Sequence, residues 1–289
     1  MGSFLSSLSD ASYASAESSI KALSSLSTHP GNQFLFQPPQ RNTYDMSSSN
    51  HTNLIKENKY CPHMVPVIHI KAMKKSFNDF TKPNRCIIYS HGNAADLYVM
   101  KDYLKILSQS LNIDVIGYDY TGYGYTQSLT TEKPSQSGCV RSLRNVVSYA
   151  KDAGYDDIIL MGSSVGTGVT LEYIKEIGGF DGKVILESPF TSVFSIINES
   201  SQNSIMDMFV NIENIKYVRK PAFILHGDAD EVVPFSQGQE LYKVHSANLL
   251  KSNQSPYDPW WMNGTGHNNI VHFHGVPVYM KKLGEYVNA

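Results

Sequence analysis

The stretch Ile158-Ile159-Leu160-Met161 runs directly into Gly162-Ser163-Ser164-Val165-Gly166, and a helix-like segment follows at residues 167–177. A short apolar run of this kind is typical of a buried strand. On a sharp turn between such a strand and a helix, the serine hydroxyl is pushed into the open. The glycines two residues on either side permit the strained turn and the close packing of helix on strand. Ser164 is therefore a candidate nucleophile. The G-x-S-x-G pattern alone is weak evidence, and its place between strand and helix gives it weight.

Apolar strands and amphipathic helices alternate on both sides of this turn. We expect strands at residues 65–72, 86–90, 115–120, 158–161, 184–186, 222–225 and 260–262, and helices at 96–110, 137–151, 167–177 and 270–286. Continuous apolar strands interleaved with amphipathic helices indicate an α/β fold with a mainly parallel sheet covered on both faces. In such a sheet, functional side chains gather in the loops beyond the carboxyl ends of the strands.

Length and composition narrow the class of protein. The chain has 289 residues, of which 41% are hydrophobic, and a net charge of −2. We expect one domain over residues 31–289, after a serine-rich tail at residues 1–30. The lysines and arginines are scattered and form no basic stripe, which argues against nucleic acid as a partner. The apolar runs are far shorter than the roughly 20 residues that span a bilayer.

The cysteines and the N-terminus indicate the compartment. Cys61, Cys86 and Cys139 are odd in number and follow no C-x-x-C spacing, so we expect free thiols in a reducing, cytoplasmic environment. The chain begins with Met1-Gly2-Ser3-Phe4-Leu5-Ser6, which fits the pattern for N-myristoylation of Gly2. One myristoyl chain holds a membrane only marginally. We therefore expect a cytoplasmic protein, with peripheral attachment to the cytoplasmic face of a membrane if Gly2 is acylated.

A serine nucleophile needs a histidine to take its proton and a carboxylate to hold that histidine. In folds with this strand–turn–helix elbow, the chain order is serine, then acid, then histidine. Asp230 follows the strand at 222–225 at a distance that lets it lean back over the sheet, whereas Asp228 is expected to shape the turn. The reverse assignment of these two carboxylates stays open.

Four histidines follow Asp230. We expect His245 on the surface of a helix, and His272 and His274 within the last helix. His267 lies in a flexible loop, Gly264-Thr265-Gly266-His267-Asn268, from which a general base can reach the serine. The histidines fit no known metal-ligand spacing, so we expect neither a metal nor another cofactor.

Acyl transfer also requires hydrogen-bond donors aimed at the developing oxyanion. One donor is expected to be the backbone N–H of Val165, directly after the serine. The second is expected to be the N–H of Asn93, in the loop Ser90-His91-Gly92-Asn93-Ala94 after an early strand. None of the glycine-rich stretches completes G-x-G-x-x-G or a Walker pattern, which argues against a nucleotide site.

These segments together resemble the α/β-hydrolase fold serine hydrolases, and most closely the α/β-hydrolase domain-containing protein 17 group of protein depalmitoylases. The matching segments are found in order at residues 34–39, 90–94, 119–124, 162–167, 187–189, 207–215, 226–232 and 264–268. The resemblance implies catalytic positions for Ser164, Asp230 and His267, and oxyanion positions for Asn93 and Val165. That group carries an N-terminal cysteine cluster, whereas this chain has serines there.

The segment at 190–220 has only about 31 residues, too few for a large cap. It is expected to form a short lid, with Phe190, Phe194 and Met208 lining an open apolar site that suits an acyl chain presented by a bulky partner. The leading interpretation is a serine hydrolase that removes long-chain acyl groups from cysteines of membrane-associated proteins. The alternatives are a cytosolic carboxylesterase or lipase-like hydrolase of small or lipid esters, a peptidase, or a non-catalytic scaffold with a hydrolase fold.

Overall fold

The computed structural model describes residues 35–39, 52–55, 64–73, 84–197 and 207–289. Within these ranges one eight-stranded sheet has the order β1-β2-β4-β3-β5-β6-β7-β8. The strands are β1 (Thr52–Ile55), β2 (Val65–Ile70), β3 (Arg85–Ser90), β4 (Asp114–Tyr118), β5 (Asp157–Ser163), β6 (Val184–Glu187), β7 (Phe223–Gly227) and β8 (Trp260–Met262). The pairs β1–β2 and β2–β4 are antiparallel, and every other neighbouring pair is parallel. The predicted fold class, an α/β fold with a mainly parallel sheet, is confirmed.

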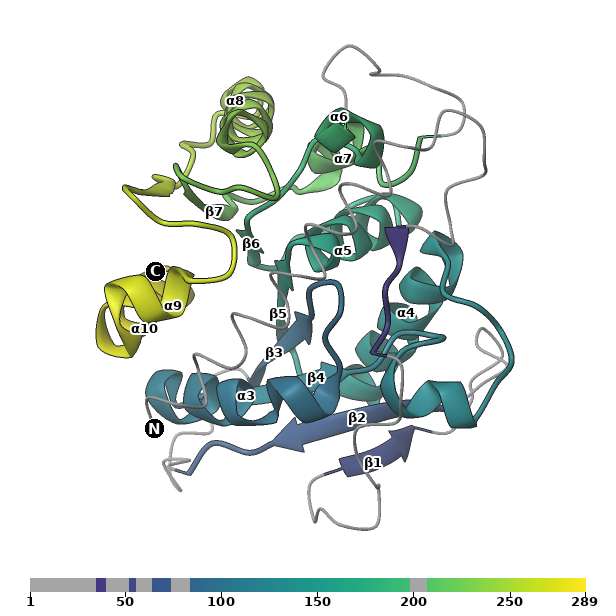
Figure 1. The fold of residues 1–289 in the computed structure, drawn as a ribbon. Coiled ribbons are helices and arrows are strands. Elements are labelled where there is room, and N and C mark those ends of the chain that lie inside the picture. Colours follow the sequence, from purple (N-terminus) through teal and green to yellow (C-terminus); the bar gives the residue numbers. More distant parts are fainter. Residues whose placement is uncertain (1–34, 40–51, 56–63, 74–83, 198–206) are drawn as a thin grey trace.

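Helices cover both faces of the sheet (Figure 1). Helices α3 (Leu97–Leu111) and α10 (Val276–Asn288) enclose one apolar core, and α4 (Gln136–Asp152), α5 (Val165–Glu176) and α8 (Phe235–Lys251) enclose the other. The shorter helical segments are η2 (Gly124–Ser128), α6 (Val193–Ile197), α7 (Asn211–Asn214), η4 (Ile215–Tyr217) and α9 (Ile270–His274).

Strand β3 explains why the central strands are apolar throughout. Cys86 and Ile88 point into the core beneath α4 and α5, whereas Ile87 and Tyr89 point into the core beneath α3 and α10. Successive side chains of a strand face opposite sides of the sheet. A strand that is buried on both sides therefore needs apolar side chains at successive positions, and the sequence of β3 shows this continuous apolar run.

Polar residues fix where two of the helices begin. Asp96 precedes α3, and its Oδ1 accepts the N–H of Val99 at 3.0 Å. Ser135 precedes α4, and its Oγ accepts the N–H of Gly138 at 3.1 Å. Each side chain satisfies a backbone donor that has no partner within the helix. The helices predicted at 96–110 and 137–151 are confirmed to within one residue at each end.

His245 is buried, whereas the sequence predicts a position on the surface of its helix. It is 1% exposed on α8, and its Nε2 accepts the N–H of Ala222 at 3.0 Å. Burial lowers its pKa to about 4, so it is a neutral acceptor at the start of β7. The spacing already contained this signal, because Leu241, His245 and Leu249 are four residues apart and share one buried face.

The helix predicted at 270–286 is in fact two helices. Gly275 separates α9 from α10 with a φ of 78°, which is a conformation that favours glycine. Pro277 then stands in the first turn of α10, a place that suits a residue without an N–H. The sequence pattern was continuous in hydrophobicity and masked this break.

Several predictions concern residues outside the described ranges. The tail at 1–30, with Gly2, and Cys61 fall there, and the single domain at 31–289 also stays a prediction. Cys86 and Cys139 are free and buried, and burial raises the pKa of the Cys139 thiol. In the ranges that the structure describes, no helix has the length and apolar character needed to cross a bilayer.

Candidate active site

Ser164 stands on the turn between β5 and α5, as the sequence predicted. Its backbone has a φ of 51° and a ψ of −120°, which is a strained conformation for a residue with a side chain. Its N–H donates to the carbonyl oxygen of Glu187 at 2.9 Å. The residue is half-buried. The turn holds its hydroxyl just beyond the carboxyl end of β5.

Two glycines make this turn sterically feasible. A Cβ added at Gly162 would lie 2.4 Å from the carbonyl oxygen of Gly166. A Cβ added at Gly166 would lie 2.1 Å from the carbonyl oxygen of Ser90. Both obstacles are backbone atoms, which cannot rotate away as a side chain would. The helix therefore packs directly on the neighbouring strand only because these positions lack a side chain.

Replacing Gly166 with alanine is expected to destabilise the fold by about 2–4 kcal/mol, because the new methyl group would displace the backbone of β3. Thermal or urea unfolding measures this loss. The matched control is Gly178→Ala, since nothing lies within 4 Å of a Cβ there. That glycine has a φ of 75°, so its change should cost only about 1 kcal/mol. Equal losses for both variants would contradict the steric argument.

The structure brings Ser164, Asp230 and His267 together from three separate segments. Nε2 of His267 is 3.0 Å from Oγ of Ser164. Nδ1 of the same ring is 2.8 Å from Oδ2 of Asp230. Both distances are in the range of hydrogen bonds, so the hydroxyl, the imidazole and the carboxylate form one hydrogen-bonded series. Ser164 follows β5, Asp230 follows β7 and His267 follows β8, so all three lie beyond the carboxyl ends of parallel strands.

The charges around His267 favour its protonated form. Burial lowers the pKa of the imidazole, but the charge and hydrogen bond of Asp230, with the charges of Glu231 and Glu187, outweigh burial and raise it. For Asp230, burial raises the pKa, and His267 together with His226 more than offsets this, so the carboxyl pKa lies below its ordinary value. Asp230 is therefore ionised while it holds the ring.

Backbone donors and a second histidine hold Asp230 in place. Its Oδ1 accepts the N–H groups of Val232 at 2.9 Å and Val233 at 2.8 Å. Its Oδ2 lies 3.1 Å from Nε2 of His226, while accepting from His267. A carboxylate fixed by four neighbours has little rotational freedom, so it orients the imidazole of His267 in turn.

His226 is a site residue to which the sequence assigned no role. It is fully buried on β7, and its Nε2 faces two acceptors, Asp230 and the carbonyl oxygen of Val233 at 3.0 Å. Nε2 therefore carries the hydrogen. Nδ1 is buried against Gly238, where an added Cβ would lie 2.4 Å away. The signal was its position at the end of β7 directly before Gly227, but only the fold reveals its partner.

Asp228 has the turn-shaping place that the sequence predicted. Its Oδ1 accepts the N–H of Gly264 at 2.7 Å, which ties the loop after β7 to the loop that carries His267. Glu231 adds a second tie, because its Oε2 accepts the N–H of His267 at 3.1 Å. The histidine loop is thus fastened at its backbone as well as at its ring.

The two predicted oxyanion donors belong to segments that adjoin Ser164. Val165 is the next residue, and the loop with Asn93 passes close by, since a Cβ added at Gly92 would lie 3.7 Å from Cβ of Ser164. Within the described ranges, neither N–H donates to another group of the protein. The side chain of Asn93 points elsewhere: Nδ2 donates to Leu35 at 2.7 Å, and Oδ1 accepts from Tyr123 at 2.7 Å.

His91 supports the same loop from below. Its ring stacks 4.1 Å from the ring of Tyr120, whose hydroxyl donates to the His91 carbonyl oxygen at 2.6 Å. Burial lowers the pKa of His91 to about 4, so the ring is neutral, and its Nδ1 donates to the carbonyl of Gly92 at 2.8 Å. The loop is therefore rigid before any ligand arrives.

The predicted lining residues fall into two groups. Phe190 is 2% exposed and packs on Phe209 and on Gly168 of α5, so it belongs to the core and does not line an open groove as we had expected. Phe194 and Met208 are partly exposed, and their assignment as lining residues stays a prediction. Residues 198–206 of this segment lie outside the described ranges.

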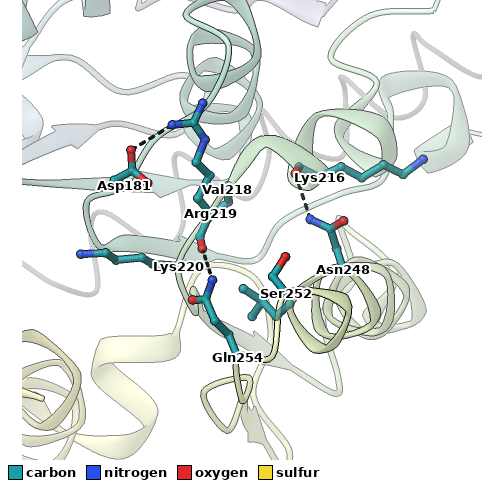
Figure 2. Close-up of a pocket in the computed structure, with 9 residues that line it drawn as sticks. Asp181, Lys216, Val218, Arg219, Lys220, Asn248, Ser252 and Gln254 are labelled. Carbon is teal, nitrogen blue, oxygen red and sulfur yellow. Dashed lines mark hydrogen bonds and ion pairs between the residues drawn. The ribbon is translucent and has the colours of Figure 1, made fainter.

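A pocket of about 430 Å³ lies away from these residues (Figure 2). It is lined by the segment before β7 and the end of α8, so it opens at the amino ends of the strands. Figure 2 shows Lys216 and Lys220 pointing away from each other, and Arg219 is paired with Asp181 at 3.0 Å. The charged side chains that line this pocket do not point toward one common centre. The candidate site is therefore the triad, which lies at the carboxyl ends of the strands.

His274, one of the histidines near the C-terminus, contacts the loop of His267. In the portion of the chain with described coordinates, no group of three His, Cys, Asp or Glu side chains could hold a metal ion. His274 instead makes a hydrogen bond of 2.9 Å with the hydroxyl of Thr265. Its contact supports the loop that carries His267.

Sequence comparisons show which proteins this chain is similar to. A family model described as serine aminopeptidase, S33, matches residues 81–212. Protein L404 of Acanthamoeba polyphaga mimivirus is 29% identical over 242 residues, which cover 82% of this chain and 86% of that protein. The α/β-hydrolase domain-containing protein 17B of Homo sapiens is 30% identical over 203 residues, which cover 70% of this chain and 66% of that protein. This chain thus matches just under two thirds of the length of the human relative.

Solved structures agree on the fold. The esterase Pf2001 of Pyrococcus furiosus superposes with a TM-score of 0.65 at 14% identity, covering 87% of this chain and 98% of that chain. Est1E of Butyrivibrio proteoclasticus superposes with a TM-score of 0.58 at 16% identity, covering 82% and 98%. With its sheet order, its serine elbow and these neighbours, the chain has the α/β-hydrolase fold and is similar in sequence to the α/β-hydrolase domain-containing protein 17 group.

Proposed function

We propose that this protein is a serine hydrolase that cleaves acyl thioesters or esters, and that its substrates are long-chain acyl groups on cysteines of membrane-associated proteins. The observation that carries the proposal is the hydrogen-bonded series from Ser164 Oγ to His267 Nε2, and from His267 Nδ1 to Asp230. Ser164 would be the nucleophile, His267 the general base and Asp230 the residue that orients the base and stabilises its charge.

In the acylation step, Oγ of Ser164 attacks the acyl carbonyl carbon while its proton moves to Nε2 of His267. The carbonyl oxygen becomes negative and accepts hydrogen bonds from the N–H groups of Val165 and Asn93. When the tetrahedral intermediate collapses, the carbon–sulfur bond breaks. The leaving cysteine thiolate takes the proton from His267, and the acyl group stays on Ser164.

Deacylation repeats these steps with water. His267 removes a proton from a water molecule, whose oxygen attacks the acyl carbon and forms a second tetrahedral intermediate. The bond to Oγ then breaks, and Ser164 recovers its proton from His267. The products are a free fatty acid and the intact enzyme, and the charge on the imidazole is transient in both halves.

The substrate class rests on the resemblance to the depalmitoylase group and on the apolar, partly exposed Phe194 and Met208 in the segment between β6 and β7. A short segment between β6 and β7 suits an acyl chain that is delivered by a second protein. Myristoylation of Gly2 would place the enzyme on the cytoplasmic membrane surface where such substrates are found.

Fluorophosphonate labelling, with Ser164→Ala as the control, tests the chemistry. Labelling of the native serine and none of the variant supports a serine hydrolase, and absence of Ser164-dependent labelling would leave a non-catalytic scaffold. Chain-length series of thioesters and oxygen esters then test the substrate. A clear preference for acetyl or butyryl oxygen esters would replace the thioesterase by a carboxylesterase, and cleavage of peptides alone would indicate a peptidase.

Two cellular experiments test the substrate and the membrane address. Acyl-biotin exchange on cell proteins, with active enzyme and with Ser164→Ala, should show loss of acyl groups only in the presence of active enzyme. Membrane partition of the native chain should exceed that of Gly2→Ala. If the native chain and Gly2→Ala partition equally, membrane attachment through a myristoyl group is contradicted. The proposed hydrolase activity is not affected by that result.

The pH dependence of kcat/KM should follow the ionisation of His267. Only the neutral imidazole can accept the serine proton, so activity rises with pH through the pKa of this ring. The surrounding carboxylates raise that pKa above its ordinary value of 6.5, and the midpoint of the acid limb should therefore lie above 6.5. Initial rates at low substrate concentration, measured from pH 5 to 9, test this. A midpoint below 6.5 would contradict the electrostatics of the site.

A further inference from the structure

Glu187 lies directly beneath the serine elbow, at the end of β6. It pairs with Ser163 in the parallel register of β5 and β6. Its backbone carbonyl accepts the N–H of Ser164 at 2.9 Å. Its side chain reaches the same strand, because Oε1 accepts the hydroxyl of Ser163 at 2.9 Å. One residue thus holds the elbow by its backbone and by its side chain.

The other carboxylate oxygen of Glu187 reaches the C-terminal helix. Oε2 accepts the hydroxyl of Tyr279 on α10 at 2.5 Å. That hydroxyl lies 3.1 Å from the hydroxyl of Tyr103 on α3. Both side-chain oxygens can therefore accept a hydroxyl hydrogen, an arrangement that is compatible with an ionised carboxylate. The two helices on that face of the sheet are tied to the elbow through this one group.

Within the described ranges, no lysine or arginine forms an ion pair with the Glu187 carboxyl. Burial raises its pKa, and the hydroxyls of Tyr279 and Ser163, with His267, lower it in part. The other titratable groups that face it, Tyr89 and Tyr103, are buried phenols with raised pKa values, so they remain neutral. Ser164 links the two residues, because its N–H donates to the Glu187 carbonyl at 2.9 Å and its Oγ lies 3.0 Å from Nε2 of His267. Among the described residues, His267 is the group near Glu187 that can become positive.

We propose that Glu187 is a positioning residue that holds the elbow of Ser164 in place and supplies a second negative charge for the imidazolium of His267. The inference rests on the proposed hydrolase function and extends it to a residue that never touches the substrate. The imidazolium forms as Ser164 loses its proton, and the fixed carboxylate stabilises it at that moment. Asp230 and Glu231 are the other negative groups that face the ring, and Asp230 holds it directly.

Glu187→Gln separates charge from shape. The amide is nearly isosteric with the carboxylate but neutral, so the pKa of His267 should fall and the acid limb of kcat/KM should move to lower pH by about 0.5–1 unit. The value of kcat/KM on the plateau should fall roughly 10-fold, because the transition-state imidazolium loses one charge partner. A residue with a merely structural role would lower the rate without moving the acid limb.

Glu172→Gln is the matched control. Glu172 is also buried, lies on α5 and bonds to Asn214 at 2.7 Å and to Lys175 at 3.1 Å, but it does not face His267. It should lose stability and keep the native acid limb. Glu187→Asp keeps the charge and shortens the side chain by one methylene. It should keep the acid limb near its native position, with a lower kcat because both hydroxyl contacts cannot be kept.

Each result bears on the inference. If Glu187→Gln has the native acid limb and the native plateau, Glu187 plays neither role. If that variant does not fold, a native kcat for Glu187→Asp overturns the positioning role. If the native protein shows no Ser164-dependent hydrolysis at all, the proposed function has failed, which is a distinct outcome. The inference is supported if the acid limb shifts in Glu187→Gln and stays near its native position in Glu172→Gln and Glu187→Asp.

Discussion

Replacing Ser164 with alanine is expected to lower kcat by roughly 10⁶-fold, the loss expected when a hydrolase loses its nucleophile. The fold should be nearly unaffected, because the serine hydroxyl contacts only His267 within the described ranges. Steady-state hydrolysis of a long-chain thioester and labelling by a fluorophosphonate both measure the loss. Circular dichroism and thermal unfolding verify that the variant is folded.

Ser163→Ala is the natural control, because a second serine stands next to the first. The hydroxyl of Ser163 points at Glu187, away from His267. The probe should therefore still label this variant, at Ser164, and the labelled peptide identifies the site by mass. Labelling that persists in Ser164→Ala and disappears in Ser163→Ala would mean that the assignment of the nucleophile is wrong.

Replacing Asp230 with asparagine should lower kcat by about 10⁴-fold. The variant loses the charge that stabilises the imidazolium, and its amide can place an N–H against Nδ1 of His267, which favours the wrong tautomer. The loss should also appear in stability, because the amide would face the N–H of His226. Hydrolysis assays at several pH values, with unfolding measured in parallel, separate the two effects.

Asp228→Asn is the matched control for this variant. Asp228 lies two residues earlier and accepts only the N–H of Gly264 among the contacts seen in the structure, and an asparagine oxygen can accept it equally. Activity should stay within a few-fold of the native value. A large loss in Asp228→Asn with a small one in Asp230→Asn would reverse the roles of the two carboxylates.

The sequence was informative wherever a residue follows a strand. Ser164, Asp230 and His267 each stand just past an apolar run, and parallel strands deliver their carboxyl ends to one edge. The local pattern therefore located all three residues that the structure brings together. It also located the loop of Asn93, since a glycine after a strand marks a tight turn.

The sequence could not reveal partners that only the fold brings together. Glu187 and Tyr279 are 92 positions apart, and Asn93 and Leu35 are 58 apart. Nothing local to any of these residues predicts the other. Phe190 was assigned to the substrate surface on hydrophobicity alone, and hydrophobicity cannot distinguish a lining residue from a core residue.

The separation of Ser164 and His267 by 103 positions has a consequence for synthesis. Ser164 and its elbow leave the ribosome before the loop that carries His267. They also leave before α10, whose Tyr279 donates a hydrogen bond to Glu187 beneath the elbow. A domain generally folds as one unit, so this site is completed only when all of its segments are available. The hydroxyl of Ser164 therefore meets its imidazole only after the segment that carries His267 has also emerged.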